Sequence, residues 1–197
     1  YAFQNCSGLK YLNSEEAGIF NIPTAVVTIS DYMFYGCSQA VNFTMGEVEK
    51  IGSYAFYNCS LVEYFNSETQ YKIEIPSTVT SIGTYAFNGM VLITELFVPN
   101  SVTSIENYVF SNCNSIEKVT LPFVGNSRWS SNTLGIIGIV NGLVKTVIIT
   151  DDNTIPASAF SGWTYIESIT IPSTVTSIGT YAFQNCSGLK YLNSEEA

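Results

Sequence analysis

Short stretches in which apolar and polar residues alternate recur along the whole chain. In residues 166–189 the apolar positions include Ile169, Ile171, Val175 and Ile178, with Ser or Thr at most of the positions between them. A period of two and β-branched side chains favour extended backbone. Proline follows the first stretch of most units, where it stops strand pairing and turns the chain. The pattern predicts two short strands in each unit.

A signature, usually Tyr-Ala-Phe, follows the second stretch of each unit. Its phenylalanines are Phe3, Phe34, Phe56, Phe87, Phe110, Phe160 and Phe183. Their sequence numbers differ by 31, 22, 31, 23, 50 and 23 in turn. The shortest spacings define the basic unit, the spacing of 50 contains one degenerate unit, and each spacing of 31 contains an inserted loop of about eight residues. Such a small unit cannot bury its apolar face alone, so its neighbours must stack on it.

The opening segment of the chain, YAFQNCSGLKYLNSEEA, recurs without change at residues 181–197. This identity defines a long period, because position 181 repeats position 1. The long period contains about seven units. We expect residues 1–197 to form a single solenoid and to be a window of a longer array. Neither end resembles a capping repeat, so we also expect end-to-end self-association or a covalent continuation.

Two segments carry a family resemblance: IPSTVTSIGTYAFNGM at 75–90 and IPSTVTSIGTYAFQNC at 171–186. They resemble the BspA-like leucine-rich repeat family, and similar units cover nearly the whole chain. The resemblance implies a β-rich solenoid, a right-handed coil of short parallel strands with about eight stacked turns here. It also implies display outside cells, often as an adhesin. The local departures are Met45-Gly46 in place of Ile-Pro, and Glu106 and Pro156 in place of the corner glycine.

Composition and charge exclude several classes of function. Seven basic and 16 acidic residues give a net charge of −9, which repels nucleic acid and anionic membranes. The chain has no histidine, the commonest general base and metal ligand, and no nucleophile or phosphate-binding motif. No apolar run is long enough to insert directly into a membrane. We expect a non-enzymatic protein without a cofactor or a metal site.

Two columns of repeated residues are the candidate structural and functional positions. The cysteines lie three residues after the signature phenylalanine: Cys6, Cys37, Cys59, Cys113 and Cys186. Met90 and Trp163 take the same place in two other units. Because this position accepts several apolar residues, a buried ladder of free thiols is favoured over disulfides or a metal site. The signature tyrosines form either a binding stripe or a packing ladder: Tyr1, Tyr32, Tyr54, Tyr85, Tyr108 and Tyr181. The Ser/Thr positions of the strands form either a solvated face or a ligand-binding face. The acidic segment Asp151-Asp152-Asn153 is interpreted as a solvated turn in preference to a calcium site.

Two functions are consistent with these features. The first is an extracellular or cell-surface, adhesin-like module that binds a protein or glycan ligand on another surface, since stacked units multiply weak contacts. The alternative is a structural fibre in which solenoid units join end to end. The unchanged recurrence of the opening segment favours the fibre more than adhesion alone would.

Overall fold

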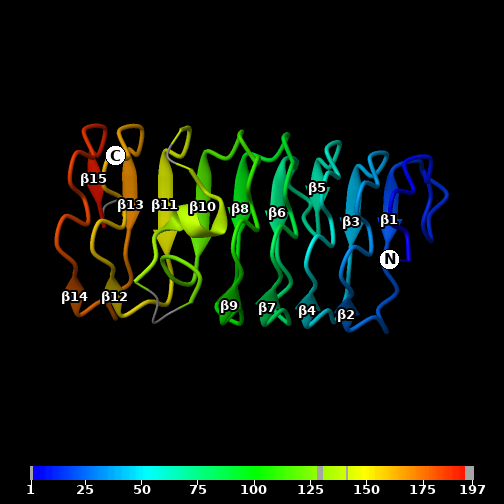
Figure 1. The fold of residues 1–197 in the computed structure, drawn as a ribbon, viewed down its shortest axis with the longest axis horizontal. Coiled ribbons are helices and arrows are strands. Elements are labelled where there is room, and N and C mark those ends of the chain that lie inside the picture. Colours follow the sequence, from blue (N-terminus) through cyan, green and yellow to red (C-terminus); the bar gives the residue numbers. More distant parts are fainter. Residues whose placement is uncertain (1, 128–130, 141, 194–197) are drawn as a thin grey trace.

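In the computed structural model, which describes residues 2–127, 131–140 and 142–193, the chain is a solenoid of parallel strands (Figure 1). The longer row of strands, here called the main sheet, has nine members: β1 (Ile19–Asn21), β3 (Asn42–Thr44), β5 (Tyr64–Phe65), β6 (Lys72–Glu74), β8 (Glu95–Phe97), β10 (Lys118–Leu121), β11 (Thr146–Ile149), β13 (Ser168–Thr170) and β15 (Tyr191–Leu192). The solenoid and its parallel strands are as predicted, with about seven full turns against the expected eight.

The second strand of each unit contributes to a shorter row, called the second sheet. It contains β2 (Thr28–Ile29), β4 (Lys50–Ile51), β7 (Ser81–Ile82) and β9 (Ser104–Ile105), and after an interruption β12 (Thr154–Ile155) and β14 (Ser177–Ile178). The third side of each turn carries the signature. It has no strand among the described residues, yet its backbone is bonded to the next turn: Phe34 N–H donates to Ala55 O (2.8 Å) and Phe56 N–H to Ala86 O (2.8 Å).

The inserted segments are additional rungs of the main sheet, which corrects their interpretation as loops. Phe65 in β5 lies opposite Ile73 in β6, only eight residues later, and Leu12 forms a parallel bridge to Phe20 with the same step of eight. In full turns of the main sheet the paired positions differ by 22 or 23, and by 28 between β10 and β11. The second sheet gains nothing from the β5–β6 insertion, because β4 pairs directly with β7.

The core is built from columns of equivalent positions. The middle residues of the main-sheet strands point inward and are fully buried: Phe20, Phe43, Phe65, Ile73, Leu96, Val119, Val147 and Ile169. The signature phenylalanines stack beside them. Ring centroids are 5.3 to 5.6 Å apart from Phe3 through Phe34, Phe56 and Phe87 to Phe110, and 5.6 Å apart between Phe160 and Phe183. Repeated burial along the axis therefore replaces a single central core.

The degenerate unit interrupts this regularity. Its long step, from Val119 in β10 to Val147 in β11, includes a short 3-10 helix, Leu134–Ile137, seen between these strands in Figure 1. No ring contact links Phe110 to Phe160 among the described residues, and the second sheet is interrupted between β9 and β12.

The glycines of the corner are required by close packing. A Cβ at Gly52 would lie 2.6 Å from Asp31 N, and one at Gly83 would lie 2.5 Å from Ser53 N. Neither glycine has a positive φ. Hence a side chain is excluded at these two corners by the backbone of the preceding turn.

Candidate binding surfaces

The signature tyrosines of four successive turns form one stack on the third side. Ring centroids are 4.8 Å apart for Tyr32 and Tyr54, 5.2 Å for Tyr54 and Tyr85, and 5.2 Å for Tyr85 and Tyr108. Their planes are within 5° to 27° of parallel. Each ring therefore turns its faces toward its neighbours, and the stack presents ring edges and hydroxyl groups to solvent.

A second row of tyrosines, which repetition in the sequence did not reveal, doubles the width of this stack. Tyr35 and Tyr57 stack at 4.7 Å with planes 3° apart, and they contact Tyr32 and Tyr54 at 5.8 and 5.6 Å. Their position directly after the signature phenylalanine is aromatic in only these two units, so the repeat pattern gave no signal. We call the combined surface the tyrosine edge: Tyr32, Tyr35, Tyr54, Tyr57, Tyr85 and Tyr108.

The last predicted member, Tyr181, lies apart from the tyrosine edge. Ser158 holds the tyrosine position in the preceding turn, and Tyr181 is 63% exposed. Tyr108, at the end of the stack, is 45% exposed, whereas Tyr32, Tyr54 and Tyr85 are half-buried. The structure thus brings four of the predicted tyrosines together, while Tyr1 is outside the described residues.

Every described signature tyrosine has a backbone conformation that L-residues rarely adopt. The φ angles are 57° at Tyr32, Tyr54 and Tyr85 and 61° at Tyr108 and Tyr181. A non-glycine residue in this region costs roughly 1 to 2 kcal/mol. Ser158 adopts the same angle, 57°, so the turn itself does not require an aromatic ring.

The surroundings of the tyrosine edge are mainly polar, with one carboxylate, that of Glu106, accepting from N–H and Oγ1 of Thr84 (3.0 and 2.6 Å) beside Tyr85. The four segments 31–37, 53–59, 84–90 and 107–113 contain Asn, Ser, Thr and Gly, a single acidic residue, Asp31, and no Lys or Arg. Tyr, Ser, Asn and Gly are the residues enriched in antibody-type binding loops.

Charged residues are instead paired beside the main sheet. Lys118 contacts Glu95 (3.0 Å), Lys145 contacts Glu117 (2.9 Å), and Lys190 contacts Glu167 (2.8 Å). Hydrogen bonding to Glu117 raises the pKa of Lys145, and hydrogen bonding from Lys190 lowers the pKa of Glu167. Exposed pairs contribute little stability, but they neutralise this surface locally.

The cysteines are free thiols that bond to the turn before them. Sγ–H donates to a phenylalanine carbonyl at 3.3 Å from Cys37 to Phe3, 3.2 Å from Cys59 to Phe34, 3.1 Å from Cys113 to Phe87 and 3.0 Å from Cys186 to Phe160. Burial raises the pKa of Cys37 and of Cys113 to about 12 and also raises that of Cys59 and Cys186. These thiols pack in or against the core and donate a hydrogen bond to the preceding turn. Because their pKa values are raised, they are poorly suited to act as nucleophiles.

The acidic turn at Asp151-Asp152-Asn153 differs from its prediction as a solvated turn. Asp152 is only 2% exposed. Its carboxylate accepts from the backbone N–H groups of Val124 (3.1 Å), Asn153 (2.9 Å) and Thr154 (3.4 Å). The carboxylate therefore holds the start of the degenerate unit against β12. Within the described residues, no three His, Cys, Asp or Glu side chains are grouped closely enough to hold a metal ion.

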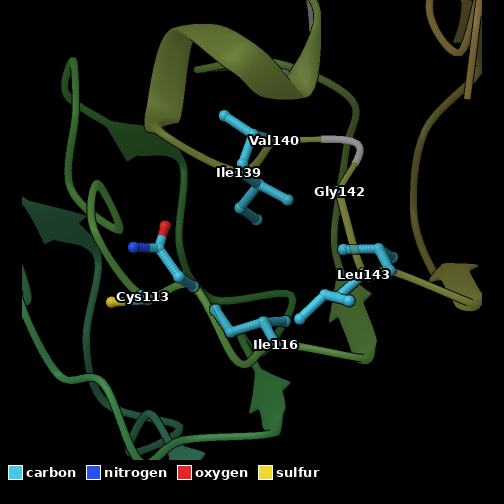
Figure 2. A pocket seen from close by; sticks show the side chains of 8 residues that line it. Cys113, Ile116, Ile139, Val140, Gly142 and Leu143 are labelled. Carbon is cyan, nitrogen blue, oxygen red and sulfur yellow. The ribbon is translucent and has the colours of Figure 1, made fainter.

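The degenerate unit also leaves a mainly apolar pocket of about 160 Å³. Figure 2 shows Ile139 and Val140 following the helical turn, with Ile116 and Leu143 on the opposite side. Val140 and Leu143, at its rim, are 60% and 47% exposed. The full lining is Cys113, Asn114, Ile116, Ile139, Val140, Gly142, Leu143 and Val144.

Each full turn contributes a strand to the main sheet and returns along backbone that is hydrogen-bonded to the neighbouring turn. This repeated arrangement defines a leucine-rich-repeat solenoid. The chain matches the BspA type leucine rich repeat region in six copies, over residues 1–71, 62–134 and 141–197, and it belongs to this family. Leucine-rich repeats are generally protein-interaction modules and typically non-enzymatic binding scaffolds. Of the helices in the described ranges, none has the length and apolar character needed to cross a membrane.

Solved structures with the same kind of repeat are similar over most of the chain. The leucine-rich repeat protein of T. pallidum has 20% sequence identity and a TM-score of 0.56, and the alignment covers 88% of this chain and 78% of that one. A leucine-rich cell surface protein of Faecalibacterium prausnitzii has 21% identity and a TM-score of 0.41, with 100% and 62% covered. None of the curated proteins compared with this chain matches it. The likeness to the T. pallidum protein shows a shared fold.

Proposed function

We propose that the chain is an extracellular, adhesin-like module that binds a protein partner through the tyrosine edge. The observation that carries this proposal is the row of stacked tyrosines at a position where Ser158 adopts the same φ without an aromatic ring. Broad aromatic side chains with few rotatable bonds give large contact area at low entropic cost. The family is one of protein-interaction modules, and its BspA-like members are described as cell surface proteins.

The stacking geometry favours a protein partner over a glycan. A sugar ring packs best on an open aromatic face, and the inner rings of the stack turn both faces toward other tyrosines. Ring edges carry partial positive charge and the hydroxyl groups donate hydrogen bonds, so the exposed rim suits carbonyl and carboxylate groups. Successive turns repeat these groups, which multiplies weak contacts.

The test replaces Tyr54, Tyr85 and Tyr108 with Ser. Serine occurs at this position and φ in Ser158, so the backbone should be retained. The matched control replaces Tyr11 and Tyr165 with Ser. These two tyrosines lie outside the tyrosine edge and are 52% and 62% exposed. Both variants and the parent are applied to arrays of extracellular matrix proteins and of glycans.

We expect the triple variant to lose at least about tenfold of the parent's binding to array proteins, and the control to lose little. Unchanged binding by a folded triple variant would assign the contact to the Ser/Thr face or the main sheet. Binding confined to glycans would overturn the choice of a protein partner.

A structural fibre is the second candidate, and one observation favours it. A binding module needs similar units, but it does not need a segment as long as YAFQNCSGLKYLNSEEA to recur without a single change.

A further inference from the structure

The two copies of the repeated segment show two different sides of the same interface. Residues 181–193 pack on the turn that precedes them, whereas residues 2–13 pack on the turn that follows them. Because the sequences are identical, each copy shows contacts that the other is equally able to make.

The contacts with the preceding turn are seen at residues 181–193. The N–H groups of Lys190 and Tyr191 donate to Glu167 O at 2.9 and 3.0 Å. Asn193 N–H donates to Ile169 O (3.0 Å), and Asn193 Oδ1 accepts from Ile171 N–H (2.8 Å). One face of the Phe183 ring stacks on Phe160.

The contacts with the following turn are seen at residues 2–13. Phe3 N–H donates to Met33 O (2.8 Å) and Asn5 N–H donates to Tyr35 O (2.6 Å). The Phe3 ring stacks on Phe34 at 5.3 Å. Asn13 Nδ2 donates to Asn21 O (3.0 Å), next to the bridge between Leu12 and Phe20.

The two sets of contacts use different atoms and so are compatible. The asparagine uses Oδ1 toward the preceding turn and Nδ2 toward the following one. The phenylalanine uses one ring face for each. One copy of the segment can therefore make both sets at once.

We propose that the outer side of residues 181–193 is a docking surface for a second copy of residues 18–57, so that this segment serves as residues 1–13 of the next unit. The side chains on this side include Tyr181 and Leu192, whose counterparts in the first copy are Tyr1 and Leu12. Among the described strands, β14 and β15 are the unpaired edges of the two sheets at this end, and β2 is the opposite edge of the second sheet.

The partner is identified by continuity with the turn-to-turn interface inside this chain. The second copy can follow in the same chain, or it can belong to another chain whose own residues 1–13 are displaced by an identical segment. In the second case the exchange replaces one set of contacts by the same set, as in domain swapping. This inference is independent of ligand binding at the tyrosine edge.

The experiment compares the chain as a single unit with a two-unit chain, in which residues 18–197 are appended directly after residue 197. If the units dock, the two-unit chain should unfold in urea in one transition, with a higher midpoint and a slope about twice that of the single unit, because neighbour interfaces add and the slope follows the exposed area. Small-angle X-ray scattering should show one rigid rod of about twice the length. An unchanged midpoint, with scattering from two flexibly linked bodies, would overturn the proposal.

A matched variant isolates the joint. Leu192→Glu with Asn193→Asp places charge on the docking surface and removes the Nδ2 donor, while Asp retains the oxygen that accepts from Ile171. In the single unit these exposed positions should leave the midpoint unchanged. At the internal joint of the two-unit chain the same pair should lower the midpoint to the single-unit value. No effect at the joint would contradict the proposal, and the scattering of the unmodified two-unit chain tests it separately.

Discussion

The described tyrosines that begin a signature have a backbone angle that glycine adopts at no steric cost. Tyr181 has φ of 61° and lies outside the stack, so Tyr181→Gly should raise the free energy of unfolding by about 1 kcal/mol. Tyr85→Gly relieves the same strain but removes stacking on Tyr54 and Tyr108, each worth roughly 0.5 to 1.5 kcal/mol. Urea unfolding should therefore place Tyr85→Gly about 1 to 3 kcal/mol below Tyr181→Gly. Equal values would show that stacking contributes nothing.

The buried thiols predict alkaline sensitivity. Burial raises the pKa of Cys37 and Cys113 from 9.0 to about 12, so the folded state holds protons that the unfolded state releases. Their contribution is fully present below pH 9 and is lost as the pH rises from 9 toward 12. Urea unfolding at pH 8 and pH 11 should show a smaller loss of stability for Cys37→Ala/Cys113→Ala than for the parent. Equal losses would count against this origin, and native protein at pH 8 should resist alkylation at both sites.

At the scale of elements, each eight-residue rung is separable from the turn that contains it. Deletion of residues 66–73 joins Phe65 to Glu74 and leaves Tyr-Phe-Glu-Ile-Pro, which has the same pattern as residues 95–99. The second sheet should be unaffected because β4 already pairs with β7. We expect a folded protein whose main sheet has one strand fewer, as judged by circular dichroism and a crystal structure. The control deletion of residues 80–87 removes β7 and the buried Phe87, and it should abolish cooperative unfolding.

The sequence was sufficient to predict the strands, the parallel solenoid and the existence of a degenerate unit, because each depends on a pattern that is repeated along the chain. It did not predict the extra rungs, since a step of eight residues occurs only twice and resembles a surface insertion. The burial of Asp152 was not predicted, because one of the N–H groups that bind its carboxylate belongs to Val124, far away in the sequence. The role of Tyr35 and Tyr57 depends on neighbours in adjacent turns, which no local pattern shows.

At the scale of the whole molecule, charge opposes binding to polyanions. The net charge is −9, and four of the six described lysines, Lys72, Lys118, Lys145 and Lys190, are paired with glutamates. Release of counterions from a phosphate backbone needs a cluster of free basic groups. Fluorescence anisotropy with duplex DNA or heparin at physiological salt should therefore show negligible binding. Measurable, salt-sensitive affinity would show that the paired lysines can be recruited.

The unequal number of rungs on the two sheets has a geometric consequence for any array of these units. Two extra rungs in each long period lengthen the main sheet by about 10 Å relative to the second sheet. A body whose two walls differ in length must bend, with the longer wall on the outside of the arc. Because identical units repeat the same bend, tandem copies should coil, with the main sheet on the outer wall. Electron micrographs of a tandem array should show this curvature, and deletion of residues 66–73 from every unit, which removes one of the two extra rungs, should reduce it.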